Sequence, residues 1–330
     1  MSTQDIQNFN NLLRSFNIKA ECVSFNKMNS YFYFDLQLKP TAKVKDIQKY
    51  SDELSLALMA PSKPSIRVLH ESGVVRLEFA ENSISKLNLI SYLRHDDVPT
   101  GEAICLLGQM VNGDKMWMDL TQNPHMIISG TTGSGKSTLL HNIIANLLVY
   151  NNVDLILVDP KMTEFYDYDL NFKSIPVHNS YIECIEVIDN LIKIMESRYE
   201  LMRAGKNLSE FKPIVLIIDE FADLIMQDSD NRFGGTLCKL AQKCRAAKIH
   251  LVLSTQRPSV DIINGAIKAN FPARIACRAS SHVDSKVILD APGAENLRGK
   301  GDALLRDNYR FLERFQIAYI DSKEVCKYFR

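Results

Sequence analysis

The chain has 330 residues, 46% of them hydrophobic, and its 39 Lys and Arg balance its 39 Asp and Glu. This length predicts two domains, and no apolar run reaches the roughly 18 residues that a membrane-spanning helix needs. The polar N-terminus lacks a signal-peptide pattern and the seven cysteines form no CxxC pair, so we expect a cytoplasmic protein with reduced thiols and no zinc site.

Residues 1–95 predict a small α+β domain. The aromatic, alternating run 31–38 predicts a strand, and apolar residues at helical spacing over 47–58 predict one helix that ends before Pro61. Two further apolar runs flank Gly73 and predict a hairpin over 66–79. A polar stretch around 95–101 predicts the linker, so we expect a second domain over 96–330.

The second domain begins with another predicted hairpin, because Asn112-Gly113 is a strong turn signal between two apolar runs. Beyond it, short apolar runs alternate with longer helical stretches. Continuous apolar strands joined by helices predict a mainly parallel sheet that is covered on both faces, an α/β fold. The predicted strands are residues 126–129, 155–158, 214–218, 249–254 and 274–277.

Residues 130–137 match the phosphate-loop pattern GxxxxGK(S/T) without a mismatch, between an apolar strand and an apolar helix over 138–150. The glycines let the backbone turn so that several N–H groups and the helix N-terminus point at one anion. We expect Lys136 to reach the β- and γ-phosphates of ATP, and the Ser137 hydroxyl to bind Mg²⁺. The predicted nucleotide-binding residues are Gly130, Thr131, Thr132, Gly133, Ser134, Gly135, Lys136, Ser137 and Thr138.

An acidic motif completes the predicted site. The apolar run 214–218 ends in Asp219 and Glu220, and ligands of open α/β folds lie at the carboxyl ends of the strands. We expect Asp219 to hold Mg²⁺, directly or through water, and Glu220 to polarise the attacking water. Asp159 and Lys161 follow another strand beside this edge, where a catalytic role and a structural pairing fit equally. The motifs predict hydrolysis of ATP or GTP, and the chain lacks the NKxD motif of GTPases.

Longer stretches around these motifs carry a resemblance to one family. They include Val158-Asp-Pro-Lys161, Ile218-Asp-Glu-Phe-Ala-Asp223 and the segments 124–137, 195–199, 240–247, 250–260, 267–275 and 284–290. Together they resemble the motor portion of the FtsK/SpoIIIE DNA translocases over residues 100–305, and residues 25–80 resemble its N-terminal subdomain more weakly. The resemblance implies a RecA-like P-loop ATPase core in a homo-oligomeric ring, a hexamer, that moves double-stranded DNA.

The resemblance also implies roles for five residues outside the nucleotide motifs. Arg245 would be an arginine finger in the neighbouring subunit's site, where a guanidinium stabilises charge on the γ-phosphate. Gln256 would couple the γ-phosphate to the DNA loops. Arg257 and Lys268 would contact DNA phosphates from pore-facing loops, without reading sequence. His282 stands where a lysine is common in the family, which implies a weaker or pH-dependent DNA contact.

The charge distribution agrees with a DNA substrate in one third of the chain. From Lys239 to Arg310 there are 13 Lys or Arg against 6 Asp or Glu, and such a segment can hold a phosphate backbone if it lines the contact surface. Full-length family members carry membrane spans, a long linker and often a winged-helix module, and we expect this protein to do without them. Its Met1 start and its end at Arg330 lead us to expect a compact natural protein.

Two alternatives remain open at this stage. A HerA-like or conjugation-coupling ring ATPase would use the same chemistry on single-stranded DNA or on a transfer complex. An ATP-switched assembly protein would use ATP to control oligomerisation and would show slow turnover that DNA does not stimulate. The Asp219-Glu220 pair and Arg245 disfavour the second alternative, since a pure switch needs little hydrolysis.

Overall fold

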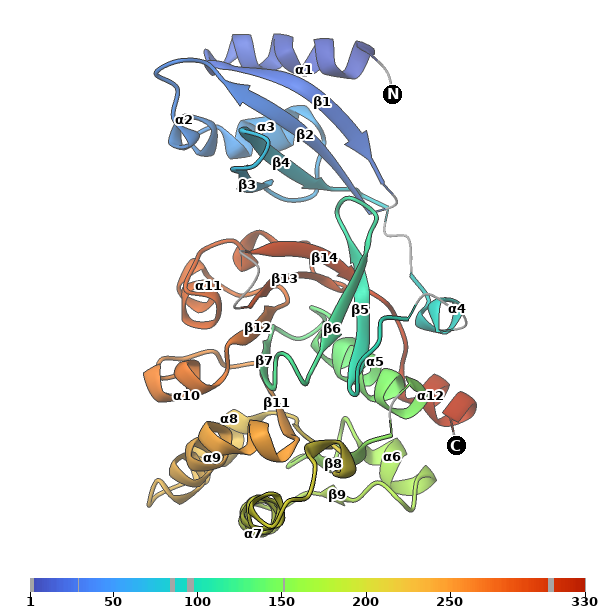
Figure 1. Ribbon diagram of the computed structural model, residues 1–330. Helices are drawn as coiled ribbons and strands as arrows, with labels where there is room; N and C mark the ends of the chain where they lie inside the picture. The colour runs from blue at the N-terminus through green and yellow to red at the C-terminus, as the bar shows by residue number, and fades with distance from the viewer. Residues whose placement is uncertain are drawn as a thin grey trace.

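The computed structural model describes residues 3–28, 30–83, 87–93, 98–150, 152–307 and 312–329, and these form two sheets with their helices (Figure 1). The predicted domain boundary between residues 95 and 96 lies outside the described residues. The smaller sheet is antiparallel, with the order β1-β2-β4-β3. Its strands are β1 (Ala20–Lys27), β2 (Tyr31–Leu38), β3 (Ser65–Leu69) and β4 (Val74–Ala80). The strand predicted over 31–38 and the hairpin predicted over 66–79 are confirmed.

The single helix predicted over 47–58 is wrong, because the structure has two short helices, α2 (Val44–Gln48) and α3 (Ser51–Ala57). The Ser51 hydroxyl donates to the carbonyl of Gln48 at 2.8 Å, a local bond that competes with the helical ladder. Tyr50, with ψ of 20°, is not helical. The apolar residues still share one face, since Ile47 and Leu54 are both fully buried against α1 (Thr3–Ser15) and the sheet.

In the described part of the chain, the larger sheet has ten strands in the order β6-β5-β14-β13-β12-β7-β11-β10-β8-β9. From β12 to β9 all neighbours are parallel, and the five predicted strands of this part are confirmed. Most of their residues are buried, which accounts for their unbroken apolar sequences. The strands are β7 (His125–Ser129), β8 (Asp154–Val158), β9 (Val177–His178), β10 (Ile214–Ile218), β11 (Ile249–Thr255) and β12 (Ala273–Ala276).

An antiparallel extension widens this sheet beyond β12. It contains the predicted hairpin, which turns at Gly113 with φ of +93°, and two strands that the sequence pattern did not predict. The strands are β5 (Ile104–Met110), β6 (Lys115–Asp119), β13 (Asp302–Arg306) and β14 (Glu313–Ile317).

Helices cover both faces of the larger sheet (Figure 1). One face packs against α4 (Leu89–Tyr92), α5 (Lys136–Tyr150), α6 (Tyr166–Asn171) and α12 (Ser322–Phe329). The other face packs against α7 (Tyr181–Arg203), α8 (Phe221–Gln227), α9 (Arg232–Lys243), α10 (Gly265–Asn270) and α11 (His282–Leu289). The residues that the structure describes also form 3₁₀ turns over Leu208–Glu210, Cys244–Ala247 and Ala294–Asn296. Among the described residues, no helix combines the length and apolarity needed to cross a bilayer.

A buried ion pair joins the two sheets. Arg314 on β14 and Asp302 on β13 are 1% and 0% exposed, and their side chains meet at 2.6 Å. Tyr31 on β2 donates its hydroxyl to Asp302 at 2.9 Å, and Arg314 donates to the carbonyl of Glu78 on β4 at 3.0 Å. Burial alone would raise the pKa of Asp302, but Arg314 holds this pKa below its ordinary value. The pair therefore fixes the small sheet against the large one.

Candidate active site

The predicted phosphate loop lies at the carboxyl end of β7, and α5 begins within it at Lys136. Gly133 and Gly135 have φ of +73° and +113°, conformations that favour glycine. A Cβ atom on Gly135 would lie 2.6 Å from the backbone nitrogen of Gly301. The amide of Gly301 donates to the carbonyl of Ser134 at 2.8 Å. The loop thus owes its shape to its own glycines and to the turn before β13.

A cavity of about 620 Å³ opens beside this loop, a volume typical of small-ligand sites. Polar groups of the loop form one part of its lining, and side chains at or just after the end of β14 and ahead of α4 form another. The lining residues are Leu87, Thr131, Thr132, Gly133, Gly135, Lys136, Ser137, Thr138, Glu164, Gln256, Lys300, Gly301, Gln316, Ile317 and Tyr319. Of these, the phosphate-loop motif indicated only the loop residues, and the family resemblance added Gln256.

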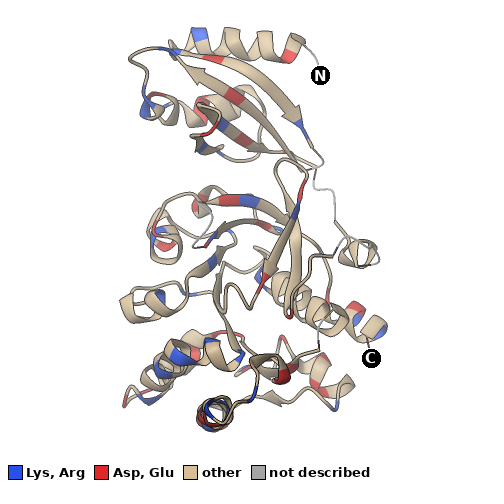
Figure 2. Cartoon of the chain, viewed as in Figure 1, with Lys and Arg blue, Asp and Glu red and all other residues tan. Residues whose placement is uncertain are grey.

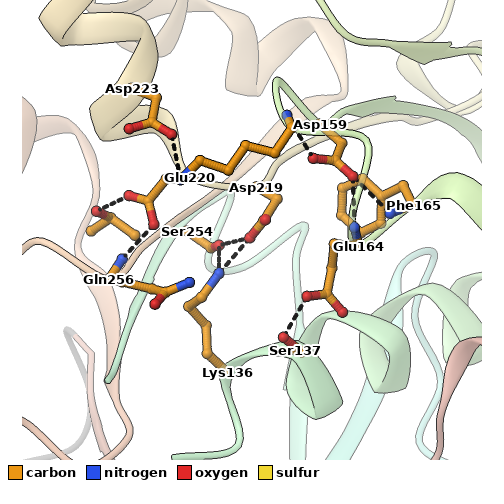
Figure 3. A network of polar contacts seen from close by, with 12 residues as sticks. Lys136, Ser137, Asp159, Glu164, Phe165, Asp219, Glu220, Asp223, Ser254 and Gln256 are labelled. Atoms are coloured by element: carbon orange, nitrogen blue, oxygen red, sulfur yellow. Dashed lines mark hydrogen bonds and ion pairs between the residues drawn. The ribbon is translucent and has the colours of Figure 1, made fainter. Parts of the chain in front are cut away.

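Lys136 and Asp219 form a direct, buried ion pair across the site, and the Ser254 hydroxyl contacts both of them (Figure 3). Lys136 donates to the Ser254 hydroxyl at 3.0 Å, and this hydroxyl donates to Asp219 at 2.8 Å. The parallel register pairs Ile218 with Leu253, so the next residues, Asp219 and Ser254, emerge side by side. The sequence predicted Asp219 here but missed Ser254.

Two hydrogen bonds hold the carboxylate of Glu220. It accepts from the Thr255 hydroxyl at 2.6 Å and from the amide of Gln256 at 2.9 Å (Figure 3). Its backbone is left-handed, with φ of 53° and ψ of 58°, a conformation that costs free energy for a non-glycine residue. The Gln256 side chain accepts from the Thr132 hydroxyl at 3.0 Å. Gln256 therefore connects Glu220 to the phosphate loop.

Glu164 is a site residue that the sequence reasoning missed. The Ser137 hydroxyl donates to Glu164 at 2.5 Å (Figure 3). His141 on α5 contacts the other carboxylate oxygen of Glu164 at 2.8 Å. Burial alone would raise the pKa of Glu164, but the hydrogen bonds from His141 and Ser137 hold it below its ordinary value. The signal available was an acid five residues after Asp159, in the loop that follows β8.

Asp159 and Lys161, for which two roles were open, both make structural contacts. Asp159 is fully buried and accepts the backbone N–H groups of Lys161, Glu164 and Phe165 at 3.1, 2.7 and 2.9 Å. The Lys161 ammonium pairs with Asp223 on α8 at 2.8 Å. Asp159 thereby shapes the turn that presents Glu164 to Ser137.

Arg245 lies at the opposite end of the parallel strands, their amino end. It is exposed in the turn Cys244–Ala247, which precedes the amino end of β11, whereas the phosphate loop follows the carboxyl end of the neighbouring parallel strand β7. A seven-residue strand spans about 23 Å, so the structure does not bring Arg245 to the Lys136 of its own chain. The Arg245 side chain lines a second cavity with Lys243, Lys248 and His250.

The predicted DNA contacts lie at opposite ends of the parallel strands. Arg257 follows the carboxyl end of β11 and His282 begins α11 after β12, and both are exposed. Lys268 lies on α10, ahead of the amino end of β12, where its ammonium pairs with Asp290 at 2.8 Å. The structure therefore does not bring Lys268 together with the other two. In the view of Figure 2, basic and acidic residues are interspersed along the elements.

The side chains at the phosphate loop suit a Mg²⁺ ion whose ligands come partly from the protein and partly from a bound nucleotide. Within the described residues, no three His, Cys, Asp or Glu side chains converge as a metal cluster. Mg²⁺ usually takes one or two protein oxygens together with phosphate oxygens and waters. The Ser137 hydroxyl and the Asp219 carboxylate are such oxygens, and both are within reach of the phosphate loop.

A glycine-rich loop at a parallel strand end, with its lysine against an acidic strand terminus, defines a P-loop ATPase of the RecA-like α/β type. A model described as the FtsK/SpoIIIE family matches residues 94–209 and 203–260. The chain belongs to the FtsK/SpoIIIE family.

Named relatives extend this result. The DNA translocase FtsK of Chlamydia trachomatis is 34% identical over 96% of this chain and 43% of its own length. The DNA translocase SftA of Bacillus subtilis is 34% identical over 90% of this chain and 33% of its own length. The chain thus spans less than half the length of these relatives. Among solved structures, the pCW3 conjugation coupling protein TcpA, determined with ATPγS, superposes with a TM-score of 0.67 at 23% identity, over 98% of this chain and 99% of that one.

Proposed function

We propose that this chain hydrolyses ATP and uses the energy to move double-stranded DNA through a ring of its own copies. The observation that carries the proposal is that Lys136, Asp219 and Glu220 lie together at the carboxyl ends of the parallel strands, beside a phosphate loop. Membership of a family whose relatives are named DNA translocases supports the choice of substrate.

Each side chain has a step in the proposed reaction. Lys136 and the backbone N–H groups of the loop bind the β- and γ-phosphates. Glu220, oriented by Thr255 and Gln256, takes a proton from the water that attacks the γ-phosphorus. The new P–O bond forms as the bond to the β–γ bridging oxygen breaks, and ADP leaves with that oxygen. Gln256, which contacts both Glu220 and Thr132, is suited to report the γ-phosphate to Arg257.

Ser137 and Asp219 would hold Mg²⁺ in this reaction. When bound, Mg²⁺ neutralises charge on the phosphate oxygens. The Lys136–Asp219 ion pair opens as phosphates arrive, because the ammonium then has stronger anionic partners.

The proposal requires more than one chain at each site. Arg245 and Lys136 lie at opposite ends of the parallel strands, so a single chain cannot direct both at one triphosphate. A neighbouring copy would supply Arg245, whose guanidinium stabilises charge developing on the γ-phosphate. Arg257, Lys268 and His282 remain the proposed DNA contacts, and Lys268 would exchange Asp290 for a phosphate.

The test is the steady-state ATPase rate with and without long double-stranded DNA, across a salt series. We expect strong stimulation that fades with salt, because contacts to phosphates release counterions. Lys136→Ala should abolish turnover in the same assay. A wild-type rate that no nucleic acid changes would contradict the proposal and favour an ATP-switched assembly protein. Triplex displacement then measures movement directly.

A second candidate is a conjugation-coupling type of ring ATPase acting on single-stranded DNA. Fold similarity to a conjugation coupling protein over nearly the whole of both chains favours it. In the same assay this candidate requires single-stranded DNA to stimulate hydrolysis more than double-stranded DNA does.

A further inference from the structure

We propose that Glu164 is a third oxygen group of the metal site, acting beside Ser137 and Asp219 to hold the divalent cation of the bound nucleotide. The inference deepens the proposed function and rests on it. It assigns a task to a side chain in the loop after β8, outside both nucleotide motifs.

The contact between Glu164 and Ser137 carries the inference. A carboxylate can only accept hydrogen bonds, so the Ser137 hydroxyl must donate its proton to Glu164 across their 2.5 Å contact. The O–H bond then points toward Glu164, so the lone pairs of the Ser137 oxygen point elsewhere and are available to bind a cation. Glu164 thus holds Ser137 in the orientation that metal binding needs.

The same contact fixes how near the cation would be to Glu164. Mg²⁺ binds oxygen at about 2.0–2.1 Å. An ion on the Ser137 oxygen would therefore lie within about 4.6 Å of the Glu164 oxygen that Ser137 contacts. One metal-bound water fits such a separation, so Glu164 can accept from that water while keeping its bond to Ser137.

Neighbouring groups keep the Glu164 carboxylate in position. His141 contacts its other oxygen at 2.8 Å, and the far ring nitrogen of His141 meets the Tyr168 hydroxyl at 3.0 Å. Asp159 binds the backbone N–H of Glu164 itself at 2.7 Å. Glu164 also lines the cavity beside the phosphate loop. An anchored carboxylate in that lining is suited to attract a cation.

The experiment measures metal affinity rather than turnover. The full chain, saturated with AMPPNP, is titrated with Mn²⁺, and bound Mn²⁺ is followed by electron paramagnetic resonance. The affinity for fluorescent mant-AMPPNP is measured separately in EDTA. Glu164→Gln keeps an acceptor oxygen and removes the charge. Asp223→Asn is the matched control, because it removes a carboxylate near the site that pairs with Lys161 instead of Ser137.

We expect Glu164→Gln to lower the Mn²⁺ affinity of the nucleotide complex by about tenfold or more, the range for groups that support metal ligands. Its mant-AMPPNP affinity in EDTA and its thermal unfolding should match the wild type, and Asp223→Asn should match the wild type throughout. Glu164→Asp, which keeps the charge, should recover part of the loss.

Three outcomes would overturn the inference. Mn²⁺ affinity within twofold of wild type would show that the carboxylate is not part of the metal site. Tighter Mn²⁺ binding by Glu164→Gln would show that Glu164 competes with the metal for Ser137. If Glu164→Gln lost mant-AMPPNP affinity in EDTA by the same factor as its Mn²⁺ affinity, the role of Glu164 would be purely structural. Failure of the proposed function looks different, since the wild type would then either bind no nucleotide with or without Mn²⁺ or hydrolyse ATP at a rate that no nucleic acid changes.

Discussion

The Thr255 hydroxyl, at the end of β11, donates at 2.6 Å to Glu220, which lies between the end of the neighbouring strand β10 and the start of α8. Together with the amide of Gln256, this bond fixes both carboxylate oxygens of a residue whose backbone is strained. A general base must be held within reach of the proton that it takes. Strain and fixed orientation at one acidic residue, beside a phosphate loop, are expected where chemistry occurs.

Glu220→Gln should bind ATP as the wild type does and lose hydrolysis, with kcat lower by about 10²–10⁴-fold, because general base catalysis is removed. Thr255→Val, which keeps the Glu220 carboxylate and removes one of its hydrogen-bond donors, should lower kcat by a smaller factor. Single-turnover hydrolysis and mant-ATP binding measure the two effects. Normal turnover in Glu220→Gln would mean that another group is the base.

Arg245→Ala should retain ATP binding and lose hydrolysis, since its guanidinium is expected at the neighbour's γ-phosphate. Mixing it with Lys136→Ala should restore activity, because a hybrid interface can combine an intact loop with an intact Arg245. ATPase rates across mixing ratios check this, with co-sedimentation of differently tagged chains as the control for mixed assembly. Mixed assemblies that stay inactive at every ratio would argue against a role in trans.

Gly135→Ala should disrupt the phosphate loop more than Gly133→Ala does. A Cβ at position 135 would lie 2.6 Å from the nitrogen of Gly301, whereas at Gly133 nothing lies within 4 Å. Gly133→Ala meets only the left-handed penalty of about 1–2 kcal/mol. Thermal unfolding and mant-ATP affinity of both variants test this order, and equal effects would contradict it.

Arg257→Ala should reduce the salt dependence of DNA binding, with the slope of log K against log salt falling by about one unit. The loss should not depend on DNA sequence. Lys323→Ala, an exposed charge on α12, is the matched control. Fluorescence anisotropy with labelled duplexes at several salt concentrations gives both slopes, and identical slopes would remove Arg257 from the DNA interface.

The Asp302–Arg314 pair should make stability depend on acid. The pKa of Asp302 lies below its ordinary 3.8 in the folded chain, so the unfolded chain takes up the proton first as pH falls. The contribution of this carboxylate is complete above about pH 4 and is lost as the pH falls through the folded-state pKa. Asp302→Asn should therefore make the free energy of unfolding depend less on pH in this acidic range.

At neutral pH, Asp302→Asn should lower the free energy of unfolding by about 3–5 kcal/mol, because it leaves Arg314 buried without its partner. Asp52→Asn is the matched control, since the 2.8 Å pair of Asp52 with Lys63 is exposed and worth about 0–1 kcal/mol. Urea unfolding of both variants at pH 7 and below pH 4 tests the two statements. Equal effects of the two substitutions would show that burial of the pair does not matter.

Local sequence signals were enough for the parts of the site that are contiguous in the chain. The phosphate loop and the Asp219-Glu220 strand end could be predicted because each motif lies on one strand or turn, with apolar residues that set the period. Ser254 and Glu164 could not, since parallel register and a capped turn bring them in from other strands.

Polar residues, most of them buried, concealed two strands. β14 contains Glu313, Arg314 and Gln316, and β13 begins at Asp302, so both look like polar loop in the sequence. Ion pairs and hydrogen bonds compensate these groups inside the fold. The helix predicted over 47–58 is interrupted at Tyr50, whose backbone is not helical, and next to it the Ser51 hydroxyl binds the carbonyl of Gln48.

Gly301 and Asp302 are consecutive, yet they face different partners. The amide of Gly301 holds the phosphate loop at Ser134, and the carboxylate of Asp302 holds Tyr31 of the small sheet. Adjacent Cα atoms are only about 3.8 Å apart, which leaves no slack between the two attachments. The small sheet and the phosphate loop are therefore tied to each other through two consecutive residues of the chain.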